Sequence, residues 1–151
     1  MGNHMILPTT FSGIRPGEES DVIGLIAATG LSVEDLNAEK LVHFIVARIG
    51  DAIVGAVGLE PAGEVALLRS LAVIENYRNQ AIATRLVATI EKYAKSHGAV
   101  ALYLLTLDVA EFFNKLAYER IDRQTAPAEL QATEEFRTLC PATAQCLYKR
   151  L

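Results

Sequence analysis

The stretch Leu68–Leu86, LRSLAVIENYRNQAIATRL, contains the junction that decides the fold. It begins inside the apolar run Val65–Val73, which is typical of a central strand buried on both faces. Further on, the apolar residues from Ile82 to Tyr93 recur at spacings of four, four and three, which is a helical stripe. A short loop joins the two patterns, so the sequence predicts a buried strand that leads directly into a long helix.

This junction presents the start of a helix beyond the end of a strand. The first amides of a helix have no acceptor within the helix, and together with the helix dipole they attract phosphate groups. Arg78 adds a positive charge in the same loop. We therefore expect a local anion site here.

Composition bounds the remaining possibilities. The chain has 151 residues, of which 51% are apolar, and a mean hydropathy of +0.24, so one ordered domain is expected over residues 6–151. No apolar run approaches the roughly 18 residues of a membrane span, and the net charge of -4 argues against a broad basic face for nucleic acid. Cys140 and Cys146 cannot build a disulfide framework, and no spacing fits a metal site. Residues 1–5 resemble a cloning remnant; without a secretory signal, a cytoplasmic protein is expected.

Apolar patterns on both sides of the junction predict the other elements. Ser32 is expected to cap a helix and Pro61 to begin a turn. The order combines an antiparallel meander with a β-α-β crossover, which predicts an α/β (α+β) fold: a mixed, mostly antiparallel sheet of about seven strands flanked by helices. The expected strands are 11–15, 43–49, 52–59, 65–73, 100–106, 118–121 and 144–151, and the expected helices are 18–29, 31–40, 80–97, 109–116 and 127–139.

The junction resembles the signature of the GNAT superfamily of acyl-CoA-dependent N-acetyltransferases: a strand reading roughly L-x-V, a short loop, then Q/R-x-x-G-x-G/A at the start of a helix. Leu71–Val73 matches the strand and Arg78–Ala83 the loop. The resemblance implies that the loop amides bind the CoA pyrophosphate and that the strand pairs with the pantetheine arm, in a sheet splayed at its centre. The cofactor-binding residues it implies are Leu71, Ala72, Val73, Arg78, Asn79, Gln80, Ala81, Ile82, Ala83, Thr84 and Phe113.

Two segments depart from the family pattern. Ala81 stands where glycine is usual; alanine costs little with a helical φ, and about 1 kcal/mol or more with a positive φ. We expect the helical φ, because residue 81 should lie in the first turn of the helix. In AEFFNKLAYERI, Phe113 replaces a tyrosine that often serves as general acid, and Ala117 replaces a glycine. This resemblance covers residues 11–121.

A narrower resemblance extends over almost the whole chain. It rests on GLE at Gly58, ALLRSLAV at Ala66, LYLLT at Leu102, FF at Phe112 and EFRTLCPATA at Glu135. Together these segments resemble GNAT proteins encoded in bacterial arsenic-resistance gene clusters, which are related to amino-acid N-acetyltransferases. The resemblance implies a link to arsenic resistance and leaves the acceptor open.

Acetylation of an amine requires that the amine lose a proton, that the thioester oxygen receive a hydrogen bond, and that the thiolate take up a proton. Glu60 is the candidate base, although a solvated turn carboxylate would look the same. By the resemblance, a backbone N–H at the bulged end of Leu71–Val73 would bind the oxyanion. Tyr103 is the candidate acid, against the alternative of a packed core aromatic.

Three further side chains are candidates for substrate binding. Arg69 interrupts a buried strand and so needs an anionic partner, which is either a protein carboxylate or a substrate carboxylate. Ser70, expected on the opposite face of the strand, is either a core hydroxyl or a substrate contact. Thr106 ends the strand that is expected on the other side of the splayed centre of the sheet.

These observations define the hypotheses. The first is an N-acetyltransferase that moves acetyl from acetyl-CoA, its co-substrate, to a small and amino-acid-like amine by direct attack in a ternary complex. The second is a module that binds CoA or acyl-CoA without turnover, because Phe113 and Ala81 depart from the pattern. The third is an interaction domain, since exposed strand edges allow a homodimer. No nucleic acid, membrane or metal partner is expected.

Overall fold

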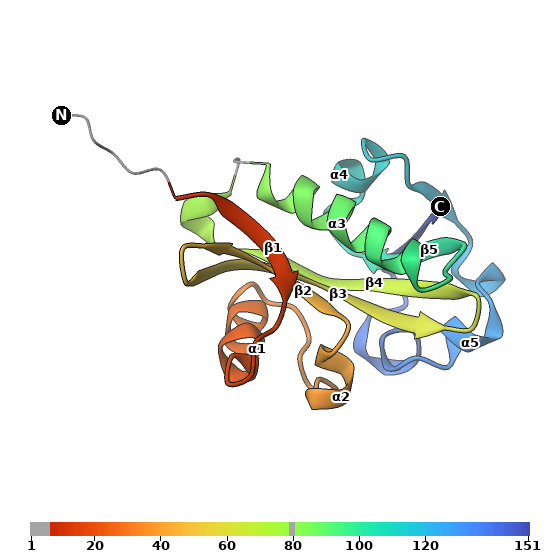
Figure 1. Ribbon diagram of the computed structural model, residues 1–151. Coiled ribbons are helices and arrows are strands. Elements are labelled where there is room, and N and C mark those ends of the chain that lie inside the picture. Colours follow the sequence, from red (N-terminus) through yellow and green to blue (C-terminus); the bar gives the residue numbers. More distant parts are fainter. Residues whose placement is uncertain (1–6, 79–80) are drawn as a thin grey trace. The chain divides into compact units, whose positions relative to one another are not determined.

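The computed structural model describes residues 7–78 and 81–151 (Figure 1). Its strands form one seven-stranded sheet in the order β1-β2-β3-β4-β5-β7-β6, with helices alongside, which confirms the predicted mixed sheet. The strands are β1 (Thr9–Gly13), β2 (Phe44–Ile49), β3 (Ala52–Ala62), β4 (Val65–Val73), β5 (Ala101–Thr106), β6 (Glu119–Ile121) and β7 (Gln145–Arg150).

The helices are mostly short. The two longest, α1 and α3, agree closely with the helices expected over 18–29 and 80–97. Among the described residues, no helix could span a membrane. The helices are α1 (Glu19–Ala28), α2 (Ala38–Leu41), α3 (Ile82–Ser96), α4 (Ala110–Asn114) and α5 (Ala128–Gln131), with single turns η1 (Glu75–Tyr77), η2 (Arg123–Thr125) and the π-helical η3 (Glu135–Leu139).

The sheet contains a parallel pair of neighbouring strands at its centre, between strands that pair antiparallel. β1 pairs with β2, β5 with β7 and β6 with β7 in antiparallel register. β4 and β5 are parallel, and they pair through Ala66 with Leu102 and Leu67 with Tyr103, near the start of both strands. Parallel neighbours need a crossover connection, and α3 provides it.

The chain divides into two compact units, which share the strands β3 and β4 and the helix α3. The first unit comprises the chain up to Val57 together with Ser70–Val87. In this unit α1 and α2 cover one face of the strands (Figure 1). Its core forms because each of these elements contributes apolar side chains, namely Val22, Ile26, Leu41, Phe44, Val46, Ala56 and Ala72.

The second unit comprises Gly58–Arg69 and Ala88–Leu151. Its core joins the end of β3 and the beginning of β4 to α5, η3 and β7. The buried residues are Ala62, Leu67, Ala126, Leu130, Phe136 and Cys146. The C-terminal segment is therefore an integral part of this unit, and it places η3 beside the strand that carries Arg69.

Three expectations about the elements are wrong. β3 continues through Pro61 to Ala62, so the turn comes later. The helix expected over 31–40 is only α2, and its cap is Asn37, whose Oδ1 accepts the Lys40 N–H at 2.9 Å, in place of Ser32. The helix expected over 127–139 is broken, because the Thr133 hydroxyl binds backbone groups of the chain on both sides of it.

The first unit also buries a charge. Arg48 in β2 is fully buried, and its guanidinium contacts both carboxylate oxygens of Glu18, the Ser12 hydroxyl and the Gly13 carbonyl oxygen. These contacts link the start of α1 to the strands. The Arg48 hydrogen bond lowers the pKa of Glu18, with a further contribution from the Arg15 N–H.

Replacement Glu18→Gln should lower the free energy of unfolding by about 3 kcal/mol at pH 7, because it leaves a buried guanidinium without its carboxylate. The pKa of Glu18 lies below its ordinary value of 4.5 in the folded protein, so its contribution is complete above that value and is lost as the pH falls through the lowered one. Urea unfolding at pH 7 and pH 3 should show a difference that shrinks in acid.

Glu19→Gln is the control, because the Glu19 carboxylate accepts the Gly17 N–H at 3.0 Å and an amide oxygen can accept the same hydrogen bond. It should change stability by less than about 0.5 kcal/mol. An equal loss in both variants would contradict the special role of the Arg48 contact.

Candidate functional site

The central strand β4 changes its backbone conformation at Ser70. This residue has φ of +60°, a left-handed conformation that is uncommon for a residue other than glycine and that occurs at the bulged position of a strand. Arg69 and Ser70 are both buried, and the chain passes from the second unit to the first between them. This departure from extended geometry lies directly before Leu71–Val73, the segment at whose end the resemblance implies a bulge.

The part of the loop after β4 that the structure describes makes two hydrogen bonds, at Ile74 and at Arg78. Ile74 donates its N–H to the Val54 carbonyl oxygen at 2.9 Å. The exposed side chain of Arg78 turns back, and its Nε donates to the Val73 carbonyl oxygen at 3.0 Å. The cation that the sequence singled out therefore lies at the end of the strand, as the anion-site hypothesis requires.

Helix α3 approaches the sheet closely at its start. A side chain at Gly55 in β3 would place its first carbon 3.0 Å from Leu86 and 3.1 Å from the Ala72 carbonyl oxygen, so this position has no room for one. Ile82 and Leu86 are buried, and Ala81 and Thr84 are exposed. The buried residues fix the helix on the sheet while its first turn stays accessible.

The expectation for Ala81 is wrong. Its φ is +60°, because α3 begins one residue later, at Ile82, and Ala81 precedes the first helical turn. The Ala81 carbonyl oxygen accepts the Arg85 N–H at 3.0 Å, which is the role of a helix N-cap residue. A left-handed alanine costs about 1–2 kcal/mol relative to an unstrained residue.

Alanine at this position has a second consequence. Serine, threonine, asparagine or aspartate as N-cap would accept the first-turn N–H groups with its own side chain, and alanine has no acceptor. The amides of Ile82, Ala83 and Thr84 are therefore suited to a phosphate ligand. Asn79 and Gln80, which were also predicted to bind it, lie outside the described residues.

Ala117 is a second left-handed alanine, and it lies at the C-terminal end of helix α4. It follows α4 with φ of +74°, its N–H donates to the Asn114 carbonyl oxygen, and the Tyr118 N–H donates to the Phe113 carbonyl oxygen. These two bonds form a Schellman motif, in which glycine is the usual residue at the left-handed position.

Ala81→Gly and Ala117→Gly should each raise the free energy of unfolding by about 1 kcal/mol, because each relieves a left-handed alanine. For a domain of this size the melting temperature should rise by roughly 2–4 °C. Unfolding scans of the two variants and of the parent chain measure this. A fall in stability for either one would show that its backbone strain is not the dominant factor.

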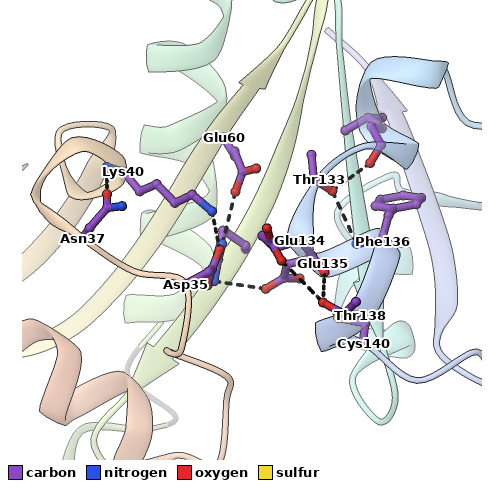
Figure 2. Close-up of polar contacts among 12 residues, drawn as sticks. Asp35, Asn37, Lys40, Glu60, Thr133, Glu134, Glu135, Phe136, Thr138 and Cys140 are labelled. Atoms are coloured by element: carbon purple, nitrogen blue, oxygen red, sulfur yellow. Dashed lines mark hydrogen bonds and ion pairs between the residues drawn. The ribbon is translucent and has the colours of Figure 1, made fainter.

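The second unit brings together two of the predicted site residues, Glu60 and Arg69. The Arg69 side chain is 1% exposed, and its Nη1 contacts Glu60 Oε1 at 3.1 Å and its Nη2 contacts Glu135 Oε1 at 3.4 Å. Figure 2 shows the carboxylates of Glu60 and Glu135 directed towards the same region. Of the two partners considered for Arg69, the structure shows protein carboxylates, and binding of a substrate carboxylate stays a prediction.

Glu135 was missed as a member of this cluster. It lies on η3, far along the chain from β3 and β4, in a segment for which the sequence predicts a helix but no site residue. A single glutamate in a helical pattern has no local signal that separates it from a surface residue. Only its burial, at 8% exposure, and its contact with Arg69 identify it.

Cys140 completes the cluster as a neutral thiol. Its Sγ donates to Glu135 Oε2 at 3.2 Å (Figure 2). Burial, together with the negative charge and hydrogen bond of Glu135, raises the pKa of Cys140 to about 12. The thiol is therefore protonated at neutral pH, which fits the structural role expected for it and argues against a nucleophile.

Glu135→Gln should lower the pKa of Cys140 and so increase its alkylation rate by iodoacetamide at pH 8, because the variant removes a neighbouring negative charge. Glu134→Gln is the control, since Glu134 is exposed and its carboxylate contacts Thr138. Peptide mass spectrometry over time measures alkylation of Cys140 separately from Cys146. Equal rates in the two variants would contradict the electrostatic contribution of Glu135.

The remaining candidates lie in the second unit. Tyr103 packs against Tyr148 with ring centroids 5.1 Å apart, and burial raises its pKa, so its hydroxyl carries a proton at neutral pH. The Thr106 hydroxyl accepts the Val109 N–H at 3.2 Å, just before α4. Phe113 is 3% exposed, as the core aromatic of α4. The functional roles of these three residues stay predictions.

Another tyrosine in this unit has a structural role. The buried Tyr118 hydroxyl donates to Glu91 Oε2 at 2.9 Å, and Lys149 Nζ contacts the same oxygen at 3.0 Å. Burial and the Glu91 charge raise the pKa of Tyr118 far above its ordinary value. This network ties α3 to β7. Within residues 7–78 and 81–151 no group of three histidine, cysteine, aspartate or glutamate side chains could hold a metal ion.

Comparison with known proteins identifies the class. A family profile described as the acetyltransferase (GNAT) family matches residues 13–120. An uncharacterised N-acetyltransferase from Chlorobaculum tepidum is 29% identical over 116 residues, which cover 76% of this chain and 72% of the relative. The chain belongs to the GNAT acetyltransferase family, and this membership supports an acyltransferase activity.

Solved structures show the same fold. N-acetylglutamate synthase from Neisseria gonorrhoeae, in complex with coenzyme A and N-acetyl-glutamate, has a TM-score of 0.81 at 16% identity; the likeness covers 95% of this chain and 35% of that one, so this chain spans about a third of the synthase. Rv2747 from Mycobacterium tuberculosis, in complex with CoA, has a TM-score of 0.80 at 17% identity over 94% of this chain and 99% of that one. The PaiA N-acetyltransferase from Thermoplasma acidophilum, also in complex with coenzyme A, has a TM-score of 0.73 at 13% identity, with 96% and 100% covered.

Proposed function

We propose that this protein transfers an acetyl group from acetyl-CoA to the amine of a small, amino-acid-like molecule in a ternary complex. The observation that carries the proposal is the accessible first turn of α3, preceded by a residue without a capping side chain, with the Arg78 guanidinium at the end of β4. Family membership and the CoA complexes of the structural neighbours support CoA as the ligand of this turn.

The proposed reaction has three requirements for side chains and backbone. The amine nitrogen attacks the thioester carbon, and Glu60 accepts the proton that the amine loses. A backbone N–H next to the left-handed residue Ser70 stabilises the oxyanion. When the carbon–sulfur bond breaks, the thiolate of CoA receives the proton of the Tyr103 hydroxyl, which burial keeps protonated. Solvent then returns a proton to Tyr103, and Glu60 releases one.

The identity of the acceptor is part of the proposal. N-acetyl-glutamate is bound by the N-acetylglutamate synthase, which supports an amino-acid-like acceptor. Ser70 and Thr106 are the proposed polar contacts for it. Arg69 already pairs with Glu60 and Glu135, so a substrate carboxylate would have to share its guanidinium with them. The resemblance to proteins of arsenic-resistance clusters extends the proposal to a cytoplasmic role in that process.

A second function has an observation in its favour. Phe113 replaces the usual tyrosine, and the left-handed Ala81 strains the start of α3. Both features fit a domain that binds CoA or an acyl-CoA without transferring the acyl group. The two functions share the CoA site and differ in turnover.

The CoA site is tested by thermal unfolding with acetyl-CoA, with CoA and with ATP as an anion control. At about 100 times the dissociation constant, a ligand of the folded state adds about 2.7 kcal/mol, or roughly 5–10 °C in melting temperature. Arg78→Ala should weaken CoA binding by about 1–3 kcal/mol, the value of a charge-assisted hydrogen bond. Lys92→Ala, which removes one exposed positive charge further along α3, should bind as the parent does. Equal stabilisation by ATP, or unchanged CoA affinity in Arg78→Ala, would reject the site.

Turnover is tested by the release of CoA thiol with a panel of amino acids and simple amines. Glu60→Gln and Tyr103→Phe should each lower kcat by about 10²–10⁴-fold, the usual contribution of general acid–base catalysis, and keep the CoA-induced thermal shift. A thermal shift with no turnover on any amine would favour the binding module over the enzyme.

A further inference from the structure

We infer that Glu135 is a positioning residue of the acetyltransferase site, which holds the Glu60 carboxylate in place through the shared guanidinium of Arg69. The inference rests on the proposed function, because it concerns the side chain proposed as the base. It adds a residue from the C-terminal segment, outside the span of the family profile, which ends at residue 120.

The geometry of the shared guanidinium carries the argument. Glu60 contacts Nη1 at 3.1 Å and Glu135 contacts Nη2 at 3.4 Å, so the two carboxylates use different nitrogens of one planar group. The side chain of Arg69 is 1% exposed, while the side chains of Glu60 and Glu135 are 18% and 10% exposed. Because the guanidinium is rigid, an anchor on Nη2 fixes where Nη1 lies and with it the oxygen of Glu60.

Glu135 is itself well anchored. Its Oε2 accepts the Cys140 thiol at 3.2 Å, and its backbone carbonyl oxygen accepts the Cys140 N–H at 3.0 Å. The guanidinium of Arg123 donates to the carbonyl oxygens of Phe136 at 2.7 Å and Pro141 at 2.7 Å. These bonds hold η3 together, and π-helical turns of this kind occur frequently at functional sites.

The second carboxylate has a specific effect on the first. An arginine and a carboxylate frequently form a bidentate pair with two parallel hydrogen bonds. By engaging Nη2, Glu135 opposes such a bidentate pair between Arg69 and Glu60. Loss of Glu135 should let Arg69 rotate onto both oxygens of Glu60 and hold the base away from the acceptor amine.

The test is a double-mutant cycle on kcat with Glu60→Gln, Glu135→Gln and the combination. Glu135→Gln should lower kcat roughly 10- to 100-fold, the effect of a displacement of about 1 Å at a reacting group, with little change in the KM for acetyl-CoA. If Glu135 acts through Glu60, the double variant should have the kcat of Glu60→Gln alone. Multiplicative losses in the double variant would overturn the inference.

Matched variants separate positioning from folding. Glu134→Gln removes the same charge from the neighbouring exposed residue and should leave kcat unchanged. If Glu135→Gln does not fold, Cys140→Ala takes its place, since it removes only the thiol donor to Glu135; its kcat should fall severalfold and should not fall further when combined with Glu60→Gln. A lower melting temperature with an unchanged kcat would overturn the inference in favour of a structural role.

The parent chain, Glu60→Gln, Glu135→Gln and the double variant also test the inference if no turnover is seen. Because Glu60 and Glu135 share one guanidinium, their effects on the melting temperature should be non-additive, and additive shifts would overturn the inference whether or not acetyl transfer is seen. The proposed function fails separately, when no amine is acetylated although CoA stabilises the protein.

Discussion

The structure depends on the strand β4, which has to serve two compact units at once. Its first residues pair in parallel with β5 in the second unit, and its last residues lead into the loop and helix of the first unit. The left-handed backbone at Ser70 marks the change between these two environments. Apolar residues bury the strand on both sides of the left-handed Ser70, so hydrophobic burial stabilises a conformation that serine alone would avoid.

Strain and buried charge are concentrated around this strand. The left-handed residues Ser70 and Ala81 flank the end of β4, and the buried Arg69 directly precedes Ser70. Each feature costs free energy unless its surroundings offset it, and sites of function are where such costs are commonly retained. Around Arg69 the carboxylates of Glu60 and Glu135 provide the offset, and around the buried Arg48 of the first unit Glu18 does.

Much of the fold could be predicted because the decisive patterns are local. The apolar residues of β4 and the helical stripe of α3 are each recognisable within a short stretch of sequence. The junction between them predicted a positive charge from Arg78 beyond the end of the strand, and Arg78 contacts the last residue of β4. Predictions failed where a single contact outweighed a pattern. Asn37 caps α2 in place of Ser32, and the Thr133 hydroxyl interrupts a helix that periodicity favoured.

By itself the sequence determined the mixed sheet, the strand–loop–helix junction and the residues of the loop, because hydrophobic period and the chemistry of a helix start are properties of neighbouring residues. Only the tertiary structure decided the conformation of Ala81 and the partners of Arg69. A φ angle at a helix boundary depends on the residue at which packing lets the helix begin, here the buried Ile82. The pairing of Arg69 with Glu135 joins β4 to η3, residues far apart in the chain, so only the folded arrangement of the second unit could bring the two charges together.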